Sequence, residues 1–308
     1  MPTEVTALAP AKINLFLRGG ARRSDGYHPL LTVFQAIDLW EKVTARETGE
    51  PGIVLTVEGL DKAKVPLGAE NLAVQAAQLV AREAGIAPRL AIDIEKRIPV
   101  AGGLAGGSAD AAATLVACDE LWRAGLGEEG RHRLAARLGS DVNFCLAGGT
   151  AIGRGRGEQL ESVATQGALT WLLVTSRKGL STREVFAQLD AMRGQTDRRL
   201  AGGPDPVLAD QPPEALLRGL RRGDLAAVGE HLVNDLEVPA LALSPELAPI
   251  LDTARTNGAL GATITGSGPT VIVLAQNPAH AQALAQAIGP PHETLITKAP
   301  ASGARLVV

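Results

Sequence analysis

Pro99-Val-Ala-Gly-Gly-Leu-Ala-Gly-Gly-Ser-Ala-Asp-Ala-Ala-Ala-Thr114 is the stretch of the 308-residue sequence that says most about the fold. Gly and Pro supply five residues before Ser108, and alanine dominates after it. A flexible loop is therefore expected to lead directly into an alanine-rich helix that ends near Trp122. Glycines let backbone N–H groups approach an anion, and the helix N-terminus adds a positive dipole, so this stretch predicts a phosphate-binding loop. The alternative is an ordinary loop with Ser108 as the helix N-cap.

Other nucleotide and catalytic motifs are absent or misplaced. No Gly-Lys pair occurs anywhere, which excludes a Walker A loop. One G-x-G-x-x-G pattern begins at Gly125, but it follows a helical stretch and places Glu128 and Glu129 where a pyrophosphate would bind. The five histidines are too scattered for a zinc signature. The glycine-rich stretch is therefore the main chemical signal.

Composition indicates an ordinary globular enzyme. The net charge is −3 and apolar residues make up 45% of the chain, which argues against a general nucleic-acid binder. Cys118 and Cys145 lie in apolar stretches without a C-x-x-C motif, as expected in a reducing cytoplasm. The first fifteen residues have no apolar run, so no signal peptide is expected. The uncharged stretch Thr256–His292 is broken by Gly, Pro, Asn and Gln, so no membrane partner is expected either.

The rest of the chain alternates strand-like and helical segments. Ala9–Leu17 alternates in a strand-like way, with Lys12 and Asn14 on its polar face. Asn71–Ala84 has helical spacing, and Ser181 with Glu184 forms a capping box for a later helix. Gly194–Pro213 is expected to be a loop.

The length favours two domains. A short polar link at Val163–Gly167 separates two strand-like runs. We therefore expect an N-terminal domain over 1–163 and a C-terminal domain over 164–308.

Asp141 and Lys12 are candidates for proton transfer and charge stabilisation. A hydroxyl that accepts a phosphoryl group benefits from a nearby carboxylate, and a neighbouring cation keeps that carboxylate ionised. The alternative makes Asp141 a helix N-cap and Lys12 a surface charge.

Three motifs occur in order: Pro10-Ala-Lys-Ile-Asn-Leu15, the loop Pro99–Ala109, and Gly266-Ser-Gly-Pro-Thr270. Together they resemble the GHMP superfamily of small-molecule kinases, which includes galactokinase, homoserine kinase and mevalonate kinase. Asp25-Gly-Tyr-His28, Leu138–Val142 and Asn234–Glu237 make the sequence most similar to the 4-diphosphocytidyl-2-C-methyl-D-erythritol kinase family of the non-mevalonate isoprenoid pathway. Mevalonate kinases instead carry Pro-Gly-Lys at the first motif. The resemblance spans essentially the whole chain.

The resemblance implies roles for individual residues. Asp141 would take the proton from the acceptor hydroxyl and Lys12 would polarise that hydroxyl. Residues implied to bind the nucleotide are Pro99, Ala101, Gly102, Gly103, Leu104, Ala105, Gly106, Gly107, Ser108 and Ala109, with Asn71 and Lys96 at its adenosine end. Residues implied to bind the acceptor are Asn14, Tyr27, His28, Asp141, Phe186, Gly266, Ser267 and Gly268. Tyr27 would stack on the cytosine, with Phe186 on its other face and His28 at its edge.

The resemblance also implies a fold and its ligands. The expected class is α+β, with an N-terminal domain like domain 2 of ribosomal protein S5, a ferredoxin-like C-terminal domain, and ATP in the cleft between them. The expected activity is ATP-dependent phosphorylation of the 2-hydroxyl of CDP-methylerythritol. Mg²⁺ is expected on the phosphates, although no acidic cluster identifies its ligand. The expected assembly is a monomer or weak homodimer.

Three alternatives remain open at this stage. A sister kinase for homoserine or mevalonate is opposed by the Asp25–His28 motif, and a diphosphomevalonate decarboxylase by Lys12. A non-catalytic nucleotide sensor of the same fold would be expected to lack Asp141 or Lys12. Asp110 departs from expectation because an acid near a phosphate site would repel ATP unless its side chain turns away or meets Mg²⁺.

Overall fold

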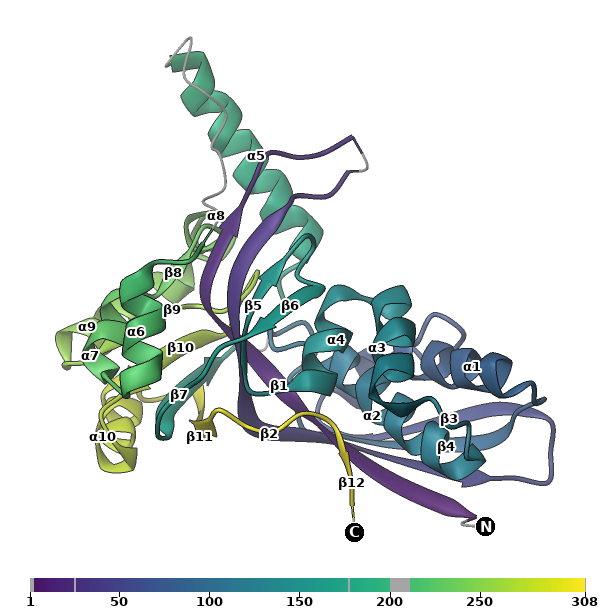
Figure 1. Cartoon of the computed structure of the whole chain (residues 1–308). Helices are drawn as coiled ribbons and strands as arrows, with labels where there is room; N and C mark the ends of the chain where they lie inside the picture. Colours follow the sequence, from purple (N-terminus) through teal and green to yellow (C-terminus); the bar gives the residue numbers. More distant parts are fainter. Residues whose placement is uncertain (1–2, 25, 177, 200–210, 308) are drawn as a thin grey trace.

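The computed structural model describes residues 3–24, 26–176, 178–199 and 211–307. Among them, two β-sheets stand side by side with helices on their outer sides, which confirms the predicted α+β class (Figure 1). No helix in this part of the chain combines the length and apolar composition that a membrane span needs.

The larger sheet is built mainly from the N-terminal half. It follows the order β12-β1-β2-β4-β3, with β5 on β2, β6 on β5 and β8 on β1. Its strands are β1 (Glu4–Gly19), β2 (Leu30–Glu47), β3 (Gly52–Gly59), β4 (Arg89–Lys96), β5 (Thr150–Arg154), β6 (Gln159–Ser162), β8 (Val233–Asn234) and β12 (Arg305–Leu306). The helices that follow them in the N-terminal half are α1 (Leu72–Ala84), α2 (Gly106–Trp122), α3 (Gly127–Leu138) and α4 (Ser140–Ala147), with a short 3-10 turn at Lys62–Lys64.

The smaller sheet is antiparallel, in the order β11-β7-β10-β9. Counted along the chain these are its fourth, first, third and second strands, which is the ferredoxin-like arrangement that the resemblance implies. Its strands are β7 (Leu169–Thr175), β9 (Gly261–Ile264), β10 (Val271–Ala275) and β11 (Glu293–Ala299). The helices of this half are α5 (Thr182–Arg199), α6 (Glu214–Arg222), α7 (Leu225–Glu230), α8 (Glu237–Leu243), α9 (Ala248–Thr256) and α10 (Pro278–Ile288), with a 3-10 turn at Pro245–Leu247.

Helix α2 lies at the centre of the N-terminal core. Small alanine side chains let it pack closely against β1, β2 and α1, and most of its residues are buried around the whole circumference. The helix ends at Trp122 as predicted, but it begins at Gly106, with Ala105 in the left-handed conformation as its N-cap. The alternative that Ser108 caps this helix is therefore wrong.

The two halves share the largest of the hydrophobic clusters. The largest buried cluster contains Ile13 of β1 and Leu115 of α2 together with Trp171 of β7 and Leu274 of β10. The indole N–H of Trp171 also donates to the side-chain oxygen of Gln35 in β2, at 3.0 Å. The chain leaves the first sheet after Ser162, yet β8 and β12 return to it. The division at 163/164 stays a prediction.

Candidate active site

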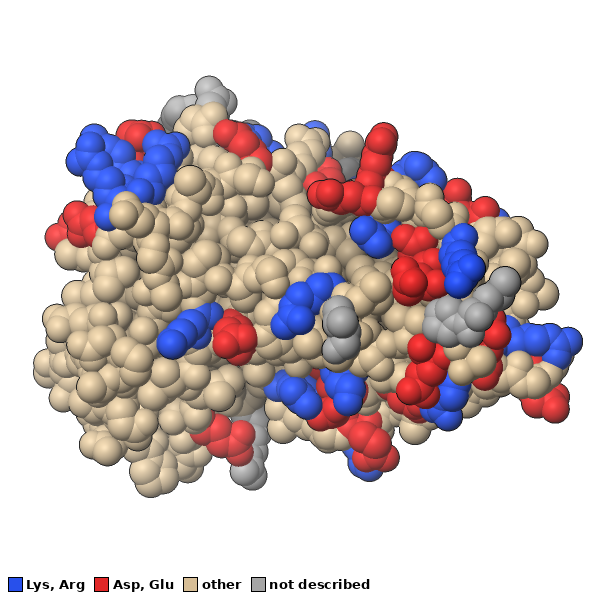
Figure 2. Space-filling model, turned by 60° about the horizontal axis from the view of Figure 1, so that its bottom comes forward, with Lys and Arg blue, Asp and Glu red and all other residues tan. Residues whose placement is uncertain are grey.

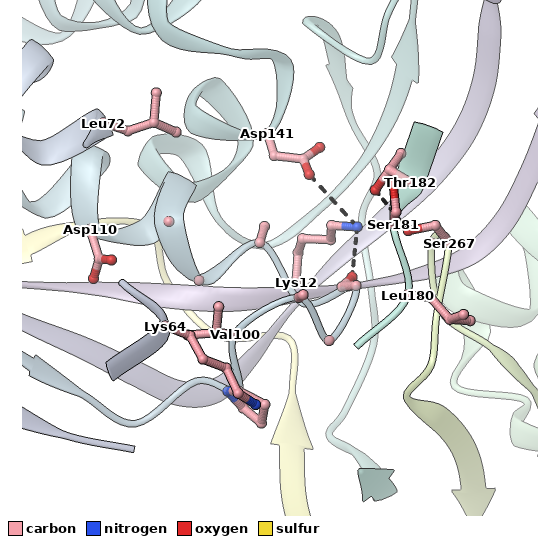
Figure 3. A pocket seen from close by; sticks show the side chains of 18 of the residues that line it. Lys12, Lys64, Leu72, Val100, Asp110, Asp141, Leu180, Ser181, Thr182 and Ser267 are labelled. Carbon is pink, nitrogen blue, oxygen red and sulfur yellow. Dashed lines mark hydrogen bonds and ion pairs between the residues drawn. The ribbon is translucent and has the colours of Figure 1, made fainter. Parts of the chain in front are cut away.

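A cavity of about 570 Å³ opens between the two halves (Figure 3). The predicted site residues that line it are Lys12, Asn14, Asn71, Lys96, Pro99, Ala101, Gly102, Gly103, Ala105, Gly106, Gly107, Asp141, Phe186, Gly266 and Ser267. Those outside its lining are Tyr27, His28, Leu104, Ser108, Ala109 and Gly268. The sequence therefore brings most of the predicted site together in one place.

The glycine loop between β4 and α2 has an unusual backbone. Ala101, Gly103 and Ala105 all have positive φ angles, of 56°, 77° and 62°. Left-handed residues at every second position turn successive N–H groups toward one side, which makes an anion-binding concavity at the start of α2. A Cβ atom at Gly103 would lie 2.4 Å from the backbone oxygen of Thr265, so only glycine fits where the loop meets the C-terminal half.

Lys12 connects the loop to the candidate base. Its Nζ donates to Asn14 Oδ1 at 2.8 Å and to the Gly103 carbonyl at 3.0 Å, and it lies 3.8 Å from Asp141 Oδ2. Figure 3 shows Lys12 and Asp141 pointing toward each other across the cavity. Lys12 is only 5% exposed, so the surface-charge alternative is wrong. Asp141 sits in the first turn of α4, after the N-cap Gly139, and its side chain is 33% exposed.

Cys145 lies one turn after Asp141 on the same helix. It is completely buried, and this burial raises the pKa of its thiol. The thiol stays protonated and buried, which excludes it as a nucleophile.

The glycine turn Gly266–Gly268 completes the floor of the cavity. A Cβ atom at Gly266 would lie 3.3 Å from both Lys12 Nζ and the Gly103 carbonyl oxygen, so all three sequence motifs meet at this point. Asn234 holds the turn, because its amide donates to the carbonyls of Ile264 and Gly266 at 2.6 and 2.8 Å. Ser267 shares a hydrogen bond of 2.9 Å with Thr182 at the start of α5 (Figure 3).

The residues predicted for the cytosine lie at the outer end of the site. Phe186 stacks on the His28 ring with centroids 4.8 Å apart, and His28 Nε2 lies 2.8 Å from Asp190 Oδ1. Tyr27 is 53% exposed, with the Arg156 guanidinium 3.8 Å from its ring centroid. The structure therefore stacks Phe186 on His28, and the Tyr27 ring carries the Arg156 guanidinium. Asp25 of the same motif lies outside the described residues.

The two residues predicted for the adenosine end have protein partners. Asn71 caps α1 by accepting from the N–H of Ala73 at 2.8 Å, and its amide donates to the Pro66 carbonyl at 2.7 Å. Lys96 is 3% exposed and forms ion pairs with Glu41 and Asp110. Asp110 thus turns toward Lys96, and Figure 3 shows it well apart from Lys12 and Asp141.

No cluster of three acidic, histidine or cysteine side chains suited to a metal ion occurs in the described ranges. The protein side chains there offer no ready-made Mg²⁺ cage.

Comparison with known proteins decides the family. Models of the GHMP kinases N terminal domain and the GHMP kinases C terminal domain match residues 71–149 and 216–290. A 4-diphosphocytidyl-2-C-methyl-D-erythritol kinase of Thermobifida fusca is 46% identical over 99% of both chains. Its counterpart in Kineococcus radiotolerans is 48% identical over 93% of this chain and 86% of its own length. The chain belongs to this GHMP kinase family.

Solved structures agree with this assignment of the kinase. A crystal structure of 4-(cytidine 5'-diphospho)-2C-methyl-D-erythritol kinase is 34% identical and covers 95% of this chain and 98% of its own, with a TM-score of 0.75. A homoserine kinase from Cytophaga hutchinsonii has the same TM-score at 20% identity, which shows a shared fold alone.

Several residues at or beside the kinase's site were missed from the sequence, among them Phe34, Thr182 and Glu41. Phe34 of β2 lines the cavity, with its ring centroid 5.6 Å from Lys12 Nζ. Thr182 bonds Ser267, and Glu41 pairs with Lys96. Phe34 and Glu41 lie in β2, which carries no sequence motif. Only the pairing of β2 with its neighbouring strands reveals that these two residues lie at the site. The capping box at Ser181 could have drawn attention to Thr182.

Proposed function

We propose that this protein transfers the γ-phosphate of ATP to the 2-hydroxyl of 4-diphosphocytidyl-2-C-methyl-D-erythritol, in the non-mevalonate route to isoprenoid precursors. Membership of the kinase family supports the reaction and the substrate. The observation that carries the site is the meeting of the glycine loop, Lys12 and Asp141 in one cavity.

The proposed chemistry is direct transfer. The acceptor oxygen attacks the γ-phosphorus while its proton passes to the Asp141 carboxylate. The bond from the γ-phosphorus to the oxygen that bridges to the β-phosphate breaks, and ADP leaves. Asp141 is partly exposed, so its proton can then pass to solvent. The Lys12 ammonium, 3.8 Å from the Asp141 carboxylate, offsets negative charge that develops during transfer.

Positioning contributes most of the catalysis in such reactions. The backbone N–H groups of the loop from Ala101 to Gly107 would hold the phosphates, and Asn14 would orient the acceptor near Asp141. Mg²⁺ would be held by the phosphate oxygens of ATP and would offset part of their negative charge. Asn71 and Lys96 would border the adenosine, and Tyr27, His28 and Phe186 the cytosine.

Setting and assembly form a further part of the proposal. The two buried free cysteines fit a reducing cytoplasm. A monomer or weak homodimer is expected because the residues that line the cavity all come from a single chain. Figure 2 shows Lys and Arg interspersed with Asp and Glu on the face that it draws, which together with the net charge of −3 suits small-molecule partners better than nucleic acid.

The experiment is a coupled assay of ADP release with ATP and Mg²⁺, run separately with CDP-methylerythritol, mevalonate and homoserine. We expect ADP release only with the cytidine compound, together with one phosphorylated product for each ADP. Release with mevalonate or homoserine but not with the cytidine compound would overturn the substrate. The kinase reaction would be overturned if ADP were released without any acceptor and if none of the three acceptors increased that release.

A further inference from the structure

Three ionisable side chains are buried together beneath the glycine loop. Lys96 Nζ lies 2.7 Å from Glu41 Oε1 and 2.8 Å from Asp110 Oδ2. Glu41 is 0% exposed, Asp110 2% and Lys96 3%. Burying a charge costs free energy unless the charge is paired and hydrogen-bonded. The proton transfer proposed for Asp141 makes no use of this cluster.

The cluster ties both ends of the glycine loop to strand β2. The Glu41 carboxylate accepts from the backbone N–H groups of Arg97 at 3.0 Å and Ile98 at 3.1 Å, immediately before the loop. Lys96 reaches across to Asp110, which lies in α2 immediately after the loop. A Cβ atom at Gly106 would lie 3.2 Å from Lys96 Nζ, so the loop rests directly on the cluster.

The charges of this cluster do not balance. Two carboxylates face one ammonium, which leaves a net charge of −1 when all three are ionised. Asp110 Oδ1 is buried without a hydrogen-bond partner in the described residues, and Asp110 lines the cavity. A polyphosphate on the loop would bring several further negative charges close to it.

The surroundings favour one retained proton. Burial, followed by the charge of Asp110, raises the pKa of Glu41 to about 7, and burial also raises the pKa of Asp110. Burial opposes the charged form of Lys96, but the two carboxylates outweigh it and raise its pKa, so the lysine stays protonated. Cys145 on α4 lies close enough to Asp110 and Glu41 for their charges to act on its thiol, as do those of Asp141 and Lys12. Lys64 and Glu70 line the same cavity as Asp110.

We propose that Glu41, Lys96 and Asp110 form a clasp that positions the glycine loop and takes up a proton when a nucleotide polyphosphate binds there. This inference rests on the proposed function, because it requires a nucleotide on the loop. Protonation removes the net negative charge and leaves one ammonium paired with one carboxylate beneath the phosphates. Glu41 acts here as a positioning residue, through the backbone N–H groups of Arg97 and Ile98.

The test is titration calorimetry of ADP binding at pH 7 in two buffers with different enthalpies of ionisation. The difference in observed heat gives the number of protons taken up per ADP. The proteins are wild type, Glu41→Gln, Asp110→Asn and the control Glu95→Gln. Glu95 lies on β4 beside Lys96, but its side chain is 43% exposed and pairs with Lys42 and Arg97. Protonation of the nucleotide itself is common to all four proteins and cancels in the comparison.

We expect proton uptake by wild type and Glu95→Gln, and its loss in Glu41→Gln and Asp110→Asn. Both variants keep Lys96 paired with one carboxylate, so both should fold. If one of them fails to fold, proton uptake by the other still decides the question. Glu41→Gln loses one of the two backbone contacts and should bind ADP up to about tenfold more weakly, which corresponds to about 1.4 kcal/mol.

Equal proton uptake in all four proteins would overturn the clasp. A complete absence of proton uptake by the wild-type protein would also overturn the clasp. No binding of ADP to wild type would overturn the nucleotide site, and the clasp with it. Binding is measured without the acceptor, so a failure of the clasp is distinguishable from a failure of the proposed phosphoryl transfer.

Discussion

Replacing Asn234 by alanine is expected to destabilise the protein and loosen the glycine turn beside Lys12. The Asn234 side chain is 8% exposed and makes three hydrogen bonds to backbone groups. Its amide donates to Ile264 and Gly266 carbonyls, and its Oδ1 accepts from the N–H of Leu236 at 2.9 Å. At about 1 kcal/mol for each bond, the free energy of unfolding should fall by about 3 kcal/mol.

The assay is urea unfolding followed by tryptophan fluorescence, with the control Asn257→Ala. Asn257 is exposed at the end of α9 and donates to the Thr253 carbonyl at 2.8 Å, so its loss should cost less than about 1 kcal/mol. The Asn234 variant should also show a higher KM for ATP, because Gly266 contacts Lys12 and Gly103. Equal losses of stability in the two variants, with an unchanged KM, would refute this reasoning.

Two further predictions concern the support of α4 and the titration of Glu41. Gly303→Ala should lower kcat and stability, because its Cβ would lie 1.9 Å from the Leu146 carbonyl oxygen and would push the C-terminal segment away from the helix that carries Asp141. Gly49→Ala is the control, because a Cβ atom at Gly49 meets nothing within 4 Å. Equal kcat values for the two variants would contradict the role of Gly303 in supporting α4. The pKa of Glu41 is raised from 4.5 to about 7, so the folded state holds a proton that the unfolded state has lost, and stability should fall by about 3 kcal/mol as pH rises through this window. Glu41→Gln should lack that fall in denaturant titrations from pH 4.5 to 7, and a parallel fall in both proteins would count against it.

Local sequence predicted the loop and the alanine helix well because their signals are short-range. Glycines and alanines dictate backbone freedom and close packing wherever they lie, and α2 ends at Trp122 as expected. The capping box at Ser181 likewise marks the start of α5, where the Ser181 hydroxyl accepts from the Glu184 N–H at 3.4 Å. The end of α5 was predicted wrongly, since the helix continues from the expected loop start at Gly194 to Arg199. Residues 200–210 of that expected loop lie outside the described residues, and 211–213 form a loop before α6 as predicted.

The position of Lys12 and Asn14 on one strand face was predictable from alternation, but the burial of that face was not. The face is buried because the Gly266 turn and the glycine loop both close over it from distant parts of the chain. The partners of Asp110 were also out of reach, because Lys96 and Glu41 meet it only through the pairing of β2 with β4. Long-range pairing, which local patterns do not encode, therefore settles the electrostatics of the site.

The measurement that tests the central claim most directly is acceptor-dependent ADP release by Asp141→Asn beside wild type. The substitution keeps the size of the side chain and removes the carboxylate that lies 3.8 Å from Lys12 Nζ. We predict a fall in kcat of about 10²- to 10⁴-fold, with the KM for ATP little changed and with Asp252→Asn, on the exposed side of α9, behaving as wild type. A well-folded Asp141→Asn protein with full acceptor-dependent activity would contradict the role of Asp141.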